Sequence, residues 1–206
     1  MISHWSLQRI ESLSDGVFAV AMTLLLVMEP AVPRSISDLR AHPTFGDVLE
    51  LLPHFRGLAA SFFVTAMIWI GHHQLFRSLV RGDLGLVWLN FLLLFGVAIQ
   101  PITTNLLGGF EQPMVVVYAA NMVFVSAILF FMWAYALIGR RLVERSIDSR
   151  YARAMLFRTA VGPCLFFTSI PVSFFSTTLA VLIWFLASPL AFWVVRPKRG
   201  QSPLCP

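Results

Sequence analysis

Charged residues are scarce in this chain. Asp, Glu, Lys and Arg make up 12% of the 206 residues, about half of the roughly 25% that is usual in soluble domains. Hydrophobic residues make up 58%, and the mean hydropathy is +0.78. This balance excludes an ordinary soluble domain. Apolar runs of membrane length predict an all-α membrane protein, because a helix satisfies its own backbone hydrogen bonds in lipid.

Cysteines and catalytic motifs are also few. The two cysteines, Cys164 in an apolar run and Cys205 near the end, suit neither a disulfide framework nor a metal site. There is no Gly-rich phosphate loop, nucleophile elbow or spaced metal motif, so we expect no enzyme, no metal and no cofactor. The pI is near 10.0, but basic and aromatic residues do not interleave on a polar element, which argues against a nucleic-acid partner.

Six apolar stretches are long enough to cross a bilayer, and we interpret residues 1–206 as a single six-helix domain. Asp15 interrupts the start of the first stretch and no cleavage site follows Met28, so we predict a retained helix rather than a signal peptide. A polar stretch, 139–153, separates the fourth span from the fifth. The predicted spans are about 13–32, 51–72, 84–107, 114–138, 155–170 and 178–195.

The distribution of Lys and Arg predicts the orientation of these spans. With six spans both termini lie on one side, and that side carries 12 of the 15 basic residues. The positive-inside rule therefore places both termini in the cytoplasm. Several tryptophans, among them Trp69 and Trp88, fall near span ends, as an aromatic belt would place them.

The most informative residue is an acid at the start of the first span. Asp15 directly follows Ser14, and Arg9 stands five residues before Ser14. An Asp at the bilayer centre costs roughly 2.5–3.5 kcal/mol on insertion scales, less near the interface, and such acids are usually functional or paired. Asp15 therefore needs a partner within the protein.

A helical wheel separates Asp15 from an apolar line on the first span. Five residues fall within about 40° of that line: Arg9, Leu13, Val20, Leu24 and Val27. Thr23 and Gly16 flank it, and Asp15 lies on the far side. If the line faces an aqueous pathway, Asp15 faces neighbouring helices. The helix is apolar all round, so periodicity alone does not choose the face.

Two histidines end the second span, and they offer Asp15 a partner. His72 and His73 point about 100° apart on a helix, which makes a poor metal pair. We expect Asp15 to accept a hydrogen bond from His73 or from a group on the third span, with Ser14 assisting. Arg9, Ser14, Asp15 and His73 would then form a structural network. Proton relay remains an alternative role for a histidine.

Other polar residues receive simpler interpretations. We interpret the polar residues of the third span as hydrogen-bonding links between helices rather than as a substrate site: Asn90, Gln100, Thr103, Thr104 and Asn105. We interpret Glu11, Asp83, Glu144 and Asp148 as solvated loop charges.

Three motifs in the first three spans resemble a known family. Residues 9–15 read R-I-E-S-L-S-D and continue as G-V-F-A-V-A-M-T-L-L-L-V-M-E; residues 69–77 read W-I-G-H-H-Q-L-F-R; residues 88–108 read W-L-N-F-L-L-L-F-G-V-A-I-Q-P-I-T-T-N-L-L-G. Together they resemble the transmembrane protein 175 family of potassium channels, in its short prokaryotic branch. The family hallmark is R-x-x-x-F-S-D, in which Leu13 replaces the Phe here.

The resemblance implies a potassium-permeable cation channel in a bacterial inner membrane. Its pore would be lined by the first helix of a homotetramer, with potassium as the permeant ion and without the T-V-G-Y-G filter, which this sequence lacks. By correspondence with the hallmark Asp, the pore constriction falls on Val20, Leu24 and Val27, and the selectivity hydroxyl falls on Thr23. The alternative for Thr23 is a bond back to its own helix backbone.

Two other functions stay open at this stage. One is a proton-coupled secondary transporter that titrates Asp15 and His73. No internal repeat of the kind common in transporters is visible. The other is a membrane scaffold that transports nothing. Because the R-x-x-x-L-S-D element occurs once, a pore built around it needs several chains.

Overall fold

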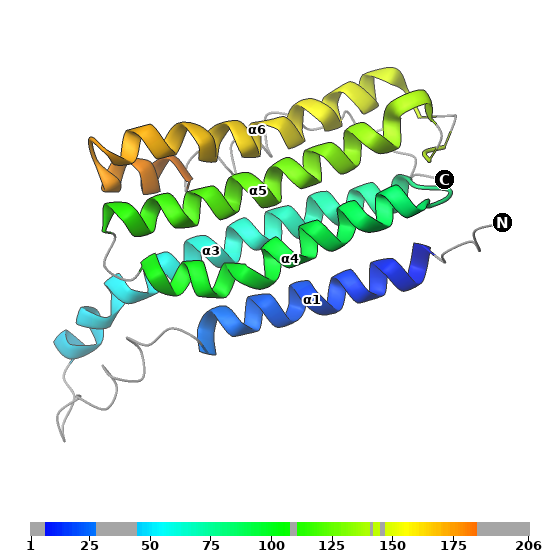
Figure 1. Ribbon diagram of the computed structural model, residues 1–206. Coiled ribbons are helices and arrows are strands. Elements are labelled where there is room, and N and C mark those ends of the chain that lie inside the picture. The colour runs from blue at the N-terminus through cyan, green and yellow to red at the C-terminus, as the bar shows by residue number, and fades with distance from the viewer. Residues whose placement is uncertain (1–6, 28–44, 108–110, 141, 145–146, 185–206) are drawn as a thin grey trace.

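Long α-helices run side by side through the computed structural model (Figure 1). It describes residues 7–27, 45–107, 111–140, 142–144 and 147–184, and their side chains except at 45–56 and 140. The helices are α1 (Leu7–Val27), α3 (Phe45–Ser78), α4 (Leu84–Leu106), α5 (Gln112–Leu137) and α6 (Ser149–Ser173), with a short 3₁₀ turn, η2 (Ile138–Arg140), and a further helical stretch at 177–184. The predicted all-α class is confirmed, and α1, α4, α5 and α6 are long and apolar enough to cross a membrane.

Acidic N-caps fix where two helices begin. Asp83 has extended backbone dihedrals, and its Oδ1 accepts a hydrogen bond from Leu86 N at 2.9 Å, which satisfies a free donor in the first turn of α4. Asp148 caps α6 in the same way, accepting from Arg150 N at 3.1 Å. The interpretation of Asp83 as a solvated loop charge was therefore wrong, because it is half-buried and caps α4. Asp148 is exposed and lies outside the helix, as interpreted, and it also caps α6.

The helices are longer than several predicted spans. α1 already begins at Leu7, so the whole R-x-x-x-L-S-D motif is helical; the predicted end of this span at 28–32 lies outside the described residues. α6 extends the predicted fifth span at both ends and continues through Pro163 to Ser173. The predicted sixth span begins within the helical stretch 177–184, and its remainder, 185–195, lies outside the described residues.

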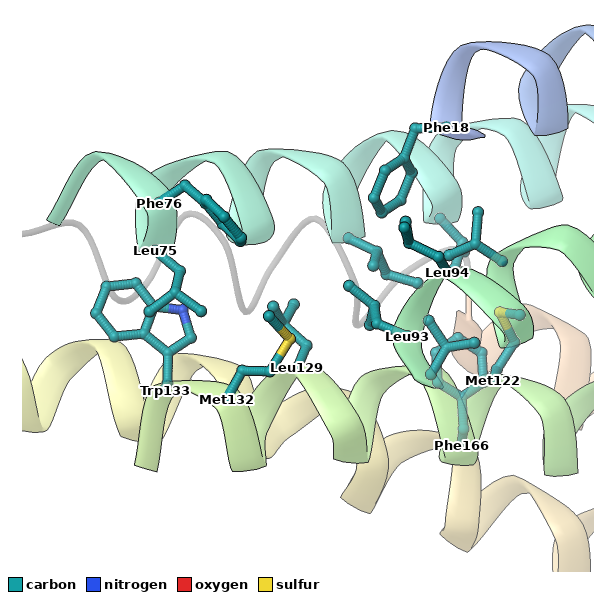
Figure 2. Close-up of a cluster of buried hydrophobic side chains, with 14 of the residues drawn as sticks. Phe18, Leu75, Phe76, Leu93, Leu94, Met122, Leu129, Met132, Trp133 and Phe166 are labelled. Carbon is teal, nitrogen blue, oxygen red and sulfur yellow. The ribbon is translucent and has the colours of Figure 1, made fainter. Parts of the chain in front are cut away.

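The order of packing places α1 at one edge of the bundle and α6 at the other (Figure 1). α3, α4 and α5 lie between them, and α1 packs on α4 and α3. Figure 2 shows the core between these helices, where Phe18 of α1 meets leucines of α4 and where Trp133 of α5 lies close to Leu75 of α3. α1 buries one face, with spacings of three or four residues: Ile10, Ser14, Phe18, Ala21 and Leu25.

Most of the charged side chains that the structure describes lie at one end of the bundle. The start of α1, the α3–α4 connection and the start of α6 all lie at this end (Figure 1). We call it the basic end, after its described and exposed arginines: Arg9, Arg77, Arg81, Arg150 and Arg153. At the opposite end, Glu111 is the charged residue among the described side chains. The described charges are thus distributed unequally between the two ends, which is the kind of asymmetry that the positive-inside rule describes.

Candidate functional site: a candidate pore helix and its polar contacts

Two polar contacts connect α1 to α3 near the basic end. Trp69 Nε1 donates a hydrogen bond of 2.8 Å to Asp15 Oδ1. One turn nearer the basic end, His73 Nδ1 lies 3.2 Å from Glu11 Oε1. The rings of Trp69 and His73 stack on each other with centroids 5.5 Å apart. The four side chains therefore form one ladder with two rungs.

The donor predicted for Asp15 was wrong. It is Trp69 of the second predicted span, rather than His73 or a group on the third span. The reason is the register of two antiparallel helices (Figure 1). Moving four residues forward on α3, from Trp69 to His73, corresponds to moving four residues back on α1, from Asp15 to Glu11. His73 is thus one turn too far along to reach Asp15, and it meets Glu11 instead.

A buried triad, Ser14, Asn90 and His72, connects α1, α3 and α4. Asn90 Nδ2 donates to Ser14 Oγ at 3.0 Å, and Asn90 Oδ1 lies 2.8 Å from His72 Nε2. Ser14 Oγ also donates to Ile10 O at 2.8 Å. All three side chains of the triad are buried. Since a carbonyl oxygen only accepts, the geometry assigns the imidazole hydrogen to His72 Nε2.

Aromatic rings fix the position of His72. Its ring lies 5.6 Å from that of Phe18 on α1 and 4.4 Å from that of Phe76, one turn along α3. The remaining nitrogen, Nδ1, has no hydrogen-bond partner among the described residues. A buried polar group held on one side by hydrogen bonds and on the other by rings has little freedom, so the triad fixes the register of three helices.

The opposite face of α1 is exposed and apolar. The residues that were placed on one line of the wheel have large exposed fractions: 57% for Val20, 37% for Leu24 and 73% for Val27. We call these residues, with the exposed Leu13, the exposed stripe. Arg9 is also exposed. In a single chain this face has no covering helix among the described residues.

Thr23 sits beside the exposed stripe and is itself exposed. Its hydroxyl donates back to the helix, to Ala19 O at 2.6 Å and to Val20 O at 3.1 Å. A hydroxyl that donates to its own backbone still presents its oxygen lone pairs outward. The two interpretations of Thr23 are thus compatible, because the back-bond orients an acceptor oxygen.

A surface groove of about 510 Å³ runs along the exposed stripe. Its floor includes Gly16 and Val20 of α1, and Ala98 of α4 forms part of the far wall. The groove is almost wholly apolar, and its described lining residues include no His, Cys, Asp or Glu. Across the described ranges, no cluster of three or more side chains of these four types is placed to bind a metal.

The sequence prediction found Ser14, Asp15 and His73, but it missed two of their partners. Trp69 was interpreted as part of an aromatic belt and Glu11 as a loop charge, whereas both face another helix. Asn90 was interpreted as one of several amides that link helices, which is confirmed: it links α4 to α1 and α3 at the centre of the triad. The missed signal was the matching spacing of four residues, Glu11 to Asp15 and Trp69 to His73.

Comparisons with known proteins identify this arrangement. Residues 9–101, which contain both contacts and the triad, match the family model described as the endosomal/lysosomal potassium channel TMEM175. A protein of Chamaesiphon minutus named as a potassium channel is 31% identical over 183 residues, which cover 86% of this chain and 89% of that protein. The chain belongs to the TMEM175 family. This is a family of ion channels, so the chain is not an enzyme.

Other members of the TMEM175 family have similar sequence identity to this chain but differ in their own length. A Streptomyces collinus protein named as a potassium channel is 29% identical, over 84% of this chain and 85% of its own. A Gallus gallus relative, named an endosomal/lysosomal proton channel, is 29% identical over 93% of this chain but only 41% of its own length. Animal relatives are thus more than twice as long as the matched region.

The fold is shared with solved structures of the family. A crystal structure described as a lysosomal potassium-selective channel TMEM175 homologue from Chamaesiphon minutus superposes with a TM-score of 0.75. The match covers 93% of this chain and 98% of that one, at 24% identity. A second structure, of a variant of the potassium channel MtTMEM175, gives a TM-score of 0.62 at 19% identity and covers 90% of each chain.

Proposed function

We propose that this TMEM175 family member is a potassium-permeable cation channel whose pore is lined by α1. The observation that carries the proposal is the contrast between the two faces of α1. One face is held to α3 and α4 by buried polar contacts, and the other exposes the stripe Val20, Leu24 and Val27. The bacterial relatives named as potassium channels support the choice of ion.

The exposed stripe would form the constriction. Rings of apolar side chains gate a pore by dewetting, and conduction then depends on how wide the ring opens. Leu24 is the largest of the three proposed constriction residues. Thr23 would contribute its hydroxyl oxygen, because the back-bond to Ala19 O leaves the lone pairs outward. Neutral oxygen atoms of this kind can replace part of the hydration shell of a monovalent cation.

One chain cannot enclose such a pore, so the proposal includes a homotetramer. A closed cyclic assembly would turn the α1 stripes of four copies toward one axis. The apolar groove beside α1, closed on its far side by Ala98 of α4, offers a surface for the neighbouring copy. The basic end would lie in the cytoplasm of a bacterium, in agreement with the positive-inside rule.

The transporter alternative loses support. It required Asp15 and His73 to act as one titrating pair, but Asp15 bonds Trp69, and His73 faces Glu11. The scaffold alternative makes no use of the exposed stripe.

The test is a reversal-potential measurement on purified full-length protein in planar bilayers, under opposed K⁺ and Na⁺ gradients. We expect a current that reverses close to the K⁺ equilibrium potential, and a mass in detergent that corresponds to four chains. Flux equal to that of empty bilayers would contradict a channel. Full flux from a monomer would contradict the pore between subunits.

A further inference from the structure

A second cavity, far from α1, lies between α3, α5 and α6. Its volume is about 100 Å³. Described residues that line it include Met67 of α3, Leu129 of α5, and Val161 and Leu165 of α6. Two glycines bring the walls close to α5. A Cβ at Gly71 would lie 3.0 Å from Leu129 Cδ2, and one at Gly162 would lie 3.0 Å from Ser126 Cβ.

Arg158 gives this apolar cavity a positive charge. Among the described lining residues it alone is charged, and the other two polar ones are Ser126 and Thr159. Both hydroxyls donate to carbonyls of their own helices, Ser126 to Met122 O at 2.5 Å and Thr159 to Met155 O at 2.9 Å. The described wall therefore offers hydrocarbon and one guanidinium group.

The position of Arg158 along α6 fits the headgroup level of a membrane. It lies three residues after residue 155, where the predicted fifth span begins, which corresponds to about 4.5 Å along the helix axis. The side chain is half-buried, and the stem of an arginine can lie on apolar surface while its head reaches toward the interface. Arg150 and Arg153 are exposed in the first turns of the same helix, so the basic end adds further positive charge.

We propose that this cavity binds an acidic phospholipid of the surrounding bilayer. The lipid phosphate would pair with the guanidinium group of Arg158, since arginine forms strong, charge-assisted hydrogen bonds with phosphate oxygens. The upper methylene groups of one acyl chain would occupy the cavity between Met67, Leu129 and Val161, which is too small for a whole chain. The charge of the site and its apolar lining together select an anionic amphiphile over a free anion or a neutral lipid.

The experiment compares phosphatidylglycerol with phosphatidylcholine of identical acyl chains, added to the full-length protein in detergent. Native mass spectrometry counts retained lipids, and the melting temperature reports stabilisation. We expect about fivefold tighter retention of phosphatidylglycerol, the factor that corresponds to roughly 1 kcal/mol from one arginine near an anionic lipid. Arg158→Gln should remove this preference, and Arg158→Lys should keep most of it. Arg153→Gln, on the exposed side of the same helix, is the matched control and should keep it.

A second variant tests the cavity itself and does not depend on the folding of Arg158→Gln. Val161→Phe fills the cavity and should reduce phosphatidylglycerol retention although Arg158 remains. Cys164→Phe, at an exposed position one turn away, is its control and should have no effect. Stabilisation by inorganic phosphate equal to that by the lipid would overturn the proposal in favour of a free-anion site. An unchanged lipid preference in Arg158→Gln, or unchanged phosphatidylglycerol retention in Val161→Phe, would overturn it as well.

Discussion

In soluble proteins apolar side chains are usually buried and polar ones exposed. The two faces of α1 show the reverse arrangement. The inward face carries polar groups, with Ser14 buried in the triad and the half-buried Asp15 bonded to Trp69. The outward face exposes large apolar side chains, among them Val20 and Val27. The polar groups form hydrogen bonds within the same chain, whereas the apolar side chains remain largely exposed in it. One face thus determines how α1 is held, and the other determines what it can line.

This difference assigns different consequences to substitutions on the two faces. A change on the inward face should alter stability and assembly, because a buried polar group that loses its partner is expensive. A change on the outward face should alter conduction with little effect on folding, because exposed positions rarely affect stability by more than about 0.5 kcal/mol. Measurements on variants of both faces therefore test whether the two faces have these separate roles.

The largest effect is expected for Asn90→Leu. It removes the centre of the triad and leaves His72 Nε2 without an acceptor, so we expect a loss of about 2–4 kcal/mol in the free energy of unfolding. A lower melting temperature and dissociation of tetramers in detergent would show it. Leu26→Asn, at an exposed position of α1 outside the stripe and the groove, is the control and should melt like the wild type. Equal melting temperatures for Asn90→Leu and wild type would show that the triad does not hold α1.

Asp15→Ala should have the next largest effect. It leaves the indole N–H of Trp69 unpaired, and hydrogen bonds to charged groups contribute about 1.5–3 kcal/mol. Trp69→Phe removes the other half of the same bond and should destabilise to a similar degree. Both are measured as melting temperature and tetramer fraction. If Asp15→Ala instead assembles and melts normally but loses ion selectivity, the acid faces permeating ions, and the inward assignment fails.

Leu24→Asn tests the outward face. A polar side chain in the proposed constriction should hold water there and raise single-channel conductance several-fold. Leu26 is also exposed on α1 but lies off the stripe, so Leu26→Asn is the matched control. Equal conductance in Leu24→Asn and wild type, or equal effects of the two asparagines, would show that the pore lies elsewhere.

Thr23→Val should have a smaller effect on conduction. The substitution keeps the size of the side chain and removes the hydroxyl, so the reversal potential under K⁺ and Na⁺ gradients should shift toward lower potassium preference, with current retained. Thr23→Ser keeps the oxygen and should keep the preference. A shift in Thr23→Ser as large as that in Thr23→Val would point to packing rather than to the oxygen.

His73→Ala should have the smallest effect. The side chains of His73 and Glu11 are 36% and 27% exposed, so solvent screens their contact. Partly exposed polar contacts of this kind contribute at most about 1 kcal/mol, and the lost stacking on Trp69 adds a little. We expect a drop in melting temperature clearly below that of Asp15→Ala. Glu11→Gln should lower it by a similar or smaller amount, and a drop beyond that of Asp15→Ala would reverse the order of the two rungs.

The amino-acid sequence alone was enough to predict the class of the protein and the two different faces of α1. The low charge is a property of composition, and the six apolar runs are a pattern along the chain. The angular separation of Asp15 from Val20, Leu24 and Val27 follows from the helical repeat alone. The three motifs in the first 108 residues were specific enough to suggest the family before any fold was known. These features need no knowledge of which helices touch.

The hydrogen-bond partners of the polar groups could be assigned only from the tertiary structure. Asp15 could be assigned a partner only once the register of α1 against α3 was known, and a shift of one turn exchanged His73 for Trp69. The central role of Asn90 likewise required α1, α3 and α4 to converge on one point. The same holds for Arg158, whose place beside an apolar cavity depends on how α3 and α6 pack on α5. The helical repeat gives the direction in which a side chain points from the helix axis. Which residues it contacts depends on the register of the neighbouring helix.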